Sequence, residues 1–137
     1  MTGRFELRGH TADVAVAAEG DTLGEVFAAV ADGLTAAMCD DIPETGERFG
    51  VAAHAESTEA LLFDYLDELI YQRDVRNVLP AAHETELHFS GEYVLEGSAR
   101  GVPLDQVAAR EVKAVTYSEM RLEETGDGRE AYVVFDV

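Results

Sequence analysis

Two positions near opposite ends of the sequence carry the residue types of a metal site. Near the N-terminus, His10 and Asp13 are three residues apart, so an imidazole and a carboxylate could share a metal ion or hydrogen-bond across a turn. At the other end, Asp136 stands beside the terminal carboxylate of Val137. Adjacent carboxylates repel each other unless a cation or hydrogen-bond donors offset their charge. Together with Asp13, these oxygen ligands suit a hard cation such as Ca²⁺ or Mg²⁺.

Both positions also have simpler explanations. An aspartate in a turn commonly accepts backbone N–H bonds, and a nearby histidine is commonly a surface residue. The last residues of a chain are commonly frayed and exposed. Judged by spacing alone, these explanations are the more frequent ones. The cation site is therefore one of two alternatives at this point.

Lys113 is the single lysine of a chain whose other nine basic residues are arginines. Its ammonium group could pair with a phosphate or a carboxylate. A lysine nucleophile of a nucleotidyltransferase is conceivable, but no glycine-rich phosphate loop accompanies it. A salt bridge to Glu111 or to another carboxylate explains Lys113 at least as well.

The other reactive side chains form no recognisable catalytic motif, so we expect no catalytic residues. His54, His83 and His88 lack the spacing of paired metal ligands. Cys39 is the single cysteine, which excludes an internal disulfide and a multi-cysteine zinc or iron–sulfur site. The sequence contains no GxSxG, P-loop or CxxC motif.

The chain is strongly acidic, with 28 acidic and 10 basic residues among 137 and a formal net charge of -18. The acidic residues are spread along the sequence, which is typical of a surface adapted to molar salt, where the Debye length is only about 3 Å. An acidic surface that binds a partner is the alternative interpretation. Clustered basic residues are absent, so we expect no strong direct binding of nucleic acid.

The location predicted from the sequence is the cytoplasm. No apolar run approaches the ~20 residues that a membrane span needs, so we expect no membrane association. The sequence does not open with a basic and then apolar leader, so nothing suggests secretion.

Hydrophobic periodicity predicts two amphipathic helices. Thr22 and Glu25 form a capping-box pattern, and the apolar residues that follow at helical spacing predict a helix over 22–38. A second helix begins near Ser57 or Thr58, either of which can act as N-cap, and is predicted to end near Arg73.

The rest of the sequence predicts strands joined by short connections. A break is expected at 77–80 and a loop at 101–104. Alternating or apolar runs indicate strands at 5–8, 12–19, 48–56, 84–89, 93–99, 112–123 and 131–137. We therefore expect an α+β fold in a single domain spanning 1–137, with a mostly antiparallel sheet and both helices packed on one face.

Four motifs resemble those of the archease family in order and spacing, over essentially the full length. They are His10-Thr11-Ala12-Asp13-Val14, the helix segment 61–71 (LLFDYLDELIY), the segment 112–117 (VKAVTY) and the terminal Asp136-Val137. Two positions depart from the common family pattern, in which an Asp stands at the position of Gly9 and a His at the position of Ser118. A supporting role of either residue around the site would be absent or altered here.

The resemblance implies a non-enzymatic accessory protein of the GTP-dependent tRNA-splicing RNA ligase, which speeds guanylylation of the ligase and restores multiple turnover. It also implies a divalent-cation site, assigned in the family to Ca²⁺, made by Asp13, Asp136 and Val137; Mg²⁺ or Mn²⁺ are alternatives. Lys113 and His10 are the expected contacts to the ligase or its nucleotide. A chaperone-like modulator and a stand-alone metal-dependent hydrolase are the competing interpretations.

Overall fold

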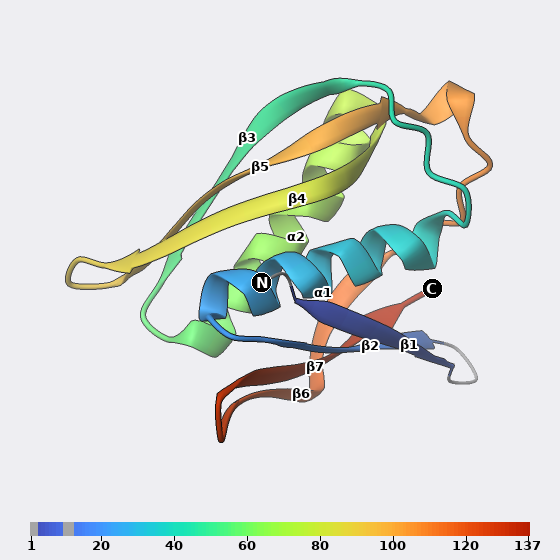
Figure 1. Ribbon diagram of the computed structural model, residues 1–137. Coiled ribbons are helices and arrows are strands. Elements are labelled where there is room, and N and C mark those ends of the chain that lie inside the picture. The colour runs from blue at the N-terminus through green and yellow to red at the C-terminus, as the bar shows by residue number, and fades with distance from the viewer. Residues whose placement is uncertain (1–2, 10–12) are drawn as a thin grey trace.

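The computed structural model describes residues 3–9 and 13–137 (Figure 1). His10, for which the sequence predicts a contact to the partner, lies outside the described residues. In chain order the elements are β1 (Arg4–Gly9), β2 (Asp13–Gly20), α1 (Leu23–Met38), β3 (Glu47–Ala55), α2 (Thr58–Arg76), β4 (Val78–Phe89), β5 (Tyr93–Pro103), a 3₁₀ turn (Leu104–Gln106), β6 (Ala114–Thr125) and β7 (Gly128–Asp136).

The strands form two antiparallel sheets with the helices between them (Figure 1). The first sheet has the order β1-β2-β7-β6 and the second has the order β3-β5-β4. The α+β class is confirmed, but the structure has two sheets where the sequence predicts one. Strand periodicity shows which residues face a core without showing which strands pair, so it could not reveal this division.

Helix α1 packs against both sheets, which explains why it is apolar around most of its circumference. Thr22 and Glu25 cap it reciprocally: the Thr22 hydroxyl accepts the Glu25 N–H at 3.1 Å, and the Glu25 carboxylate accepts the Thr22 N–H at 3.1 Å. Gly33 lies where α1 crosses the first sheet, and a Cβ added there would be 2.5 Å from Val16 Cγ1. The close approach of α1 to β2 therefore requires glycine at this position.

Helix α2 and strand β4 both extend further than the sequence predicts. The helix continues three residues past Arg73 to Arg76, and Asn77, with φ of 56° and ψ of 46°, forms its left-handed cap. Strand β4 begins at the next residue, Val78, so the break expected at 77–80 is wrong. Pro80 is tolerated inside the strand because β4 lies at the edge of the second sheet. Strand β5 likewise runs through Pro103, across most of the predicted loop.

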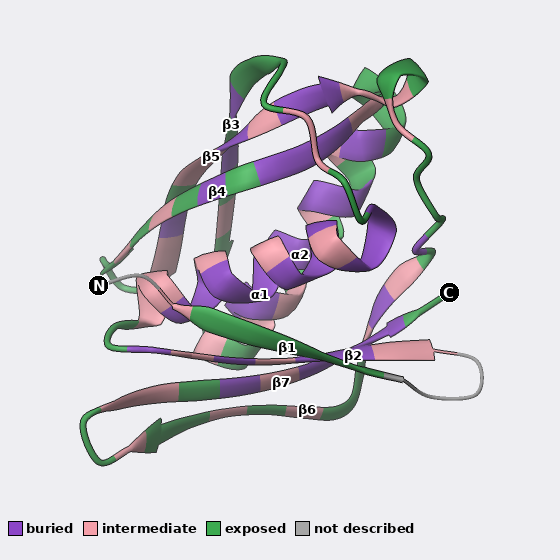
Figure 2. Ribbon diagram, turned by 45° about the vertical axis from the view of Figure 1, so that its right-hand side comes forward, coloured by how far each residue is buried: buried purple, intermediate pink, exposed green. Residues whose placement is uncertain are grey.

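Most of the buried apolar residues, purple in Figure 2, form one contiguous core between the sheets. Phe27 of α1 and Tyr65 of α2 stack with ring centroids 6.3 Å apart and join the two helices. Val16 and Val133, opposite each other in β2 and β7, are fully buried beneath them. No helix among the described residues is long and apolar enough to cross a membrane.

A buried polar group lies where α1 meets β4. His83 is buried beside a bulge in β4, and its Nε2 is 2.8 Å from Thr35 Oγ1. The His83 backbone N–H donates to the Asp32 carboxylate at 3.3 Å. Burial, together with the nearby Arg48 charge, lowers the pKa of His83 from 6.5 to about 3. Burial raises the pKa of Asp32, and both burial and the Asp32 charge raise that of Tyr65.

The neutral burial of His83 should make stability depend on pH. Below pH 6.5 the unfolded histidine takes up a proton that the folded protein cannot bind until the pH approaches about 3. The contribution of neutral His83 to the free energy of unfolding is thus complete above pH 6.5. It is lost as the pH falls, by up to about 1.4 kcal/mol per pH unit. Urea unfolding between pH 7.5 and pH 4.5 should show a smaller loss in His83→Gln than in the wild type.

A second histidine on the same strand provides the control for this measurement. His88 is exposed, so His88→Gln should keep the wild-type slope. The raised pKa of Asp32 makes stability rise as the pH falls, which is opposite to the effect of His83. This effect is common to all three proteins, because the Asp32 carboxylate accepts the backbone N–H of residue 83 and not its side chain. Equal slopes in the wild type and in His83→Gln would contradict the assignment.

Candidate carboxylate site

The structure places Asp13 and Asp136 directly opposite each other at one end of the first sheet. Asp13 begins β2 and Asp136 ends β7, in an antiparallel register that runs without a shift along the two strands. The intervening core is made by residues such as Val14 and Phe135, which face the helices. Because side chains alternate along a strand, Asp13 and Asp136 lie on the opposite side of the sheet, here called the outer face.

The pairing makes these two residues, here called the carboxylate pair, a source of repulsion. Side chains opposite each other on neighbouring strands have Cβ atoms ~5 Å apart, and like charges at such positions are destabilising. Asp13 is half-buried and Asp136 is exposed. The donor set fits a hard cation, which would offset both charges. Within 3–9 and 13–137, no three His, Cys, Asp or Glu side chains form a metal cluster. A cation at the carboxylate pair would therefore need further oxygen ligands, which Val137, the residue directly after Asp136, can supply.

Lys113 lies beside the carboxylate pair. Its backbone N–H donates to the Asp136 carbonyl at 2.8 Å, and the next residue, Ala114, is opposite Asp136 in the register of β6 and β7. The Lys113 side chain is exposed, and the ion pairs of the described part of the chain do not include one between it and Glu111. Strand ends that are far apart in the sequence therefore bring Asp13, Asp136 and Lys113 to one end of the sheet.

Two arginines that the sequence did not single out fix the connection 107–113, which precedes β6 and ends at Lys113. Arg73 is 8% exposed, and its guanidinium donates to the Val112 carbonyl at 2.6 Å. The backbone N–H of Arg110 donates to the Met38 carbonyl at 2.6 Å, and its guanidinium donates to the Ala37 carbonyl at 3.0 Å. A buried arginine at the polar end of an amphipathic helix was hard to foresee, since its position predicts exposure.

An aromatic contact joins two of the four motifs. Phe63 of α2 and Tyr117 of β6 stack with ring centroids 4.1 Å apart and planes inclined by 6°. Tyr117 lies at a register shift between Thr116 and Arg121, where the regular pairing of β6 with β7 is interrupted. Ser118, one of the two departures from the family pattern, is exposed in this bulge, and its N–H donates to Thr116 Oγ1.

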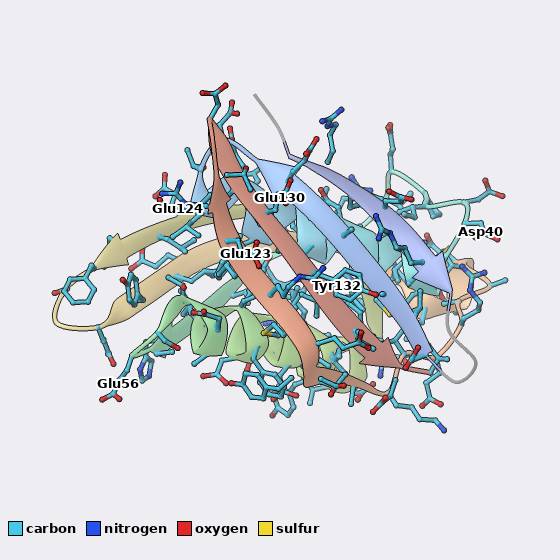
Figure 3. All side chains as sticks on the ribbon, turned by 90° about the horizontal axis from the view of Figure 1, so that it is seen from below. Asp40, Glu56, Glu123, Glu124, Glu130 and Tyr132 are labelled. Carbon is cyan, nitrogen blue, oxygen red and sulfur yellow. The ribbon has the colours of Figure 1, made fainter. Side chains whose placement is uncertain are left out.

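The outer face also carries a hollow of about 430 Å³ further along the strands. Tyr132 and Glu130 of β7 lie on it with Glu123 of β6, as Figure 3 shows from below. The Arg121 guanidinium lies over the Tyr132 ring, 4.7 Å from its centroid. Arginines and carboxylates both line the hollow, so it does not have the charge of a phosphate site.

Together these features define a class of protein: a small α+β protein whose two antiparallel sheets enclose two helices and which holds a carboxylate pair at one end of a sheet. Comparison with known proteins narrows the class. The Archease protein family (MTH1598/TM1083) matches residues 5–137, and the chain belongs to this family.

Its similarity to known relatives extends over almost the whole chain. It is 34% identical over 131 residues to the archease of Pyrococcus furiosus, covering 92% of each chain. It is 35% identical over 144 residues to the archease of Methanosarcina acetivorans, covering 98% of this chain and 96% of the relative.

Two solved structures are similar in fold. The solution structure of Methanobacterium thermoautotrophicum protein 1598 has a TM-score of 0.85 at 30% identity, covering 97% of this chain and 98% of that one. The crystal structure of a Thermotoga maritima archease, described as a possible chaperone, has a TM-score of 0.67 at 24% identity, covering 96% of this chain and 98% of that one.

Removing one charge of the carboxylate pair should stabilise the protein when no divalent cation is bound. In EDTA, we expect Asp136→Asn to raise the free energy of unfolding by about 0.2–0.5 kcal/mol, at the low end for opposed charges because Asp136 is exposed. Added Ca²⁺ should stabilise the wild type and leave Asp136→Asn unchanged in thermal unfolding. Glu130→Gln, on the same face of β7, should respond to Ca²⁺ as the wild type does; equal stabilisation of Asp136→Asn would contradict a cation at this site.

Removing the Arg73 guanidinium should leave the Val112 carbonyl buried without its donor. We expect Arg73→Met to lower the free energy of unfolding by about 2 kcal/mol, as for a lost hydrogen bond to a charged group. Urea denaturation measures this, with Arg4→Met as the control. Arg4 forms an exposed ion pair with Glu19, and such pairs contribute about 0–1 kcal/mol. A loss in Arg73→Met no larger than in the control would show that Arg73 does not anchor the connection.

Proposed function

We propose that this protein is an accessory activator of the GTP-dependent tRNA-splicing RNA ligase, which promotes guanylylation of the ligase and its multiple turnover. The observation that carries the proposal is the direct opposition of Asp13 and Asp136 at one end of the first sheet, beside Lys113. Membership of the archease family supports the proposal, and the ligase role comes from the resemblance of the motifs.

The cation proposed at this end would be held by Asp13, Asp136 and main-chain oxygen of Val137. Carboxylate and main-chain oxygens are preferred by Ca²⁺, and Mg²⁺ or Mn²⁺ are the alternatives. When bound, a divalent cation supplies positive charge that can neutralise a triphosphate. Guanylylation depends on charge neutralisation and on alignment of the attacking group, to which a partner at the ligase active site can contribute.

The protein's own residues would act by position and charge. The carboxylate pair supplies cation ligands from two neighbouring strands. The register of these strands leaves the two aspartates little freedom to move apart. Lys113 extends an exposed ammonium from beside these strands, and its backbone is tied to Asp136. This ammonium is suited to a phosphate of the nucleotide or to a carboxylate of the ligase. We assign no catalytic residue to the chain itself.

The net charge of -18 supports a protein partner of opposite charge. An enzyme that binds RNA presents basic surface, which an acidic accessory protein complements. The same charge disfavours direct binding of RNA by this chain. It also suits a cytoplasm of molar salt, in which contacts between exposed charges over long distances are screened.

The test is a ligation assay in molar KCl with the cognate ligase present in smaller amount than its RNA substrate. The ligase–GMP adduct is measured in parallel. We expect the wild type to produce faster adduct formation and more than one turnover per ligase. Asp13→Asn and Asp136→Asn should lose both effects, because each removes a proposed cation ligand. Glu130→Gln removes a charge from the same face and should retain both effects.

Two results would overturn the proposal. If the wild type changes neither the adduct nor the turnover, the chain is not an activator of this ligase. Suppressed aggregation of unrelated proteins would then support a chaperone-like role, and phosphatase or nucleotidase turnover would support a metal-dependent hydrolase. Full activity of Asp13→Asn and Asp136→Asn would show that the carboxylate pair is not the functional part.

A further inference from the structure

Strand β1 is an open edge of the first sheet. It pairs with β2 on one side, and no described strand lies on its other side. Its apolar residues Phe5 and Leu7 are 40% and 39% exposed. Figure 2 shows β1 exposed in front of α1. An edge with unpaired backbone groups and exposed apolar side chains is a template for another strand.

The other edges of the two sheets are less suited to pairing. Strand β4 contains Pro80 and a register shift between Ala81 and Glu84. Strand β6 has the register shift that begins at Thr116. Strand β3 is regular, but its inward apolar side chains are buried in the core of their own chain. Proline and bulges are two usual protections of a sheet edge, and β1 as described has neither, although it is short and carries three charged side chains.

The sequence of β1 is complementary to itself in antiparallel pairing. Its residues alternate between the outer face, with Arg4, Glu6 and Arg8, and the helix side, with Phe5 and Leu7. A two-fold axis through Leu7 places Leu7 opposite Leu7 of the second copy. The same register places Glu6 opposite Arg8 of the second copy, and this pair occurs twice by symmetry.

Neighbouring registers are less favourable. A two-fold axis through Glu6 sets Glu6 against Glu6 and Arg4 against Arg8, so that every pair on the outer face carries like charges. An axis through Phe5 also opposes unlike charges, Arg4 and Glu6, but it would draw Arg4 away from its ion pair with Glu19 of the neighbouring strand β2. Arg8, by contrast, forms an ion pair with Glu6 of its own strand at 3.5 Å. In the register centred on Leu7, each of these two residues lies opposite the other one of the second copy.

We propose that two copies of this chain associate through β1 in the register centred on Leu7, joining two four-stranded sheets into one continuous sheet. The occupant of the edge is a second copy, because the alternation of charge and apolar residues in β1 matches itself. Backbone hydrogen bonds and the Leu7 contact supply attraction, and the Glu6–Arg8 pairs fix the register. In molar salt the repulsion between two chains of charge -18 is screened over distances beyond about 3 Å. The dimer leaves β7 and β6, with Asp136 and Lys113, uncovered.

The experiment measures molecular mass by sedimentation equilibrium of the full chain in about 1 M KCl, where charges in contact still interact. We expect twice the 14.9 kDa of one chain at high concentration. Glu6→Arg and Arg8→Glu should each weaken dimerisation roughly tenfold or more, because like charges replace the two pairs. The double variant, Glu6→Arg with Arg8→Glu, should restore it. Glu123→Arg, at the opposite edge of the outer face, should dimerise as the wild type does.

The double variant keeps the proposal falsifiable if a single variant is less stable, because it contains both substitutions and must regain the dimer. Circular dichroism of each variant establishes that it is folded. A wild type that stays monomeric at millimolar concentration would overturn the proposal. An intact dimer in Arg8→Glu would overturn the register, and a monomeric double variant would overturn the pairing of Glu6 with Arg8. Calcium binding is measured separately and does not enter the result.

Discussion

The antiparallel pairing of β2 with β7 is the interaction on which the rest of the protein depends. Strand β7 lies in the middle of the first sheet, so it provides the hydrogen-bonding partner for both β2 and β6. Its inward residues Val133 and Phe135 are fully buried against the helices. The register of the same pairing brings Asp13 and Asp136 together on the outer face. Core and carboxylate site thus depend on one alignment, because a shift by one residue would exchange the two faces.

Enclosure of the helices is the second constraint, and the sequence showed only part of it. The capping box of α1, the N-cap region of α2 and most strand positions followed from local patterns, since they depend on contacts within a few residues. The division into two sheets did not follow, because it depends on pairings between distant strands. The continuation of β4 through Pro80 was missed for a related reason: proline is compatible with an edge strand, and edge position is a property of the sheet.

The candidate site, too, could be predicted only where it depends on residue type and not on contacts between distant parts of the chain. Asp13, Asp136 and Lys113 could be singled out by residue type, and the fold brings them to one end of the sheet. Arg73 and Arg110 could not be singled out, because their significance lies in the carbonyls of Val112 and Ala37 that they contact. Arg73 is buried, which is uncommon for arginine, and it satisfies the Val112 carbonyl of a connection without regular structure; Arg110 is exposed and ties this connection to the end of α1. Charge and motif identify a site, while the groups that hold it in place are visible only in the contacts.

The position of β7 at the end of the chain order has a consequence for synthesis on the ribosome. Strands β3, β4 and β5 are close in sequence and can form the second sheet while the chain is still growing. Strand β2 can pair with β1 and pack against α1 early, but its second partner, β7, is made roughly a hundred residues later. Nascent chains should therefore pass through a half-folded stage with one finished sheet, in which the edge of β2 that later pairs with β7 is open and prone to association with other chains. The carboxylate pair exists only in molecules that have passed this stage, which makes it a marker of complete folding.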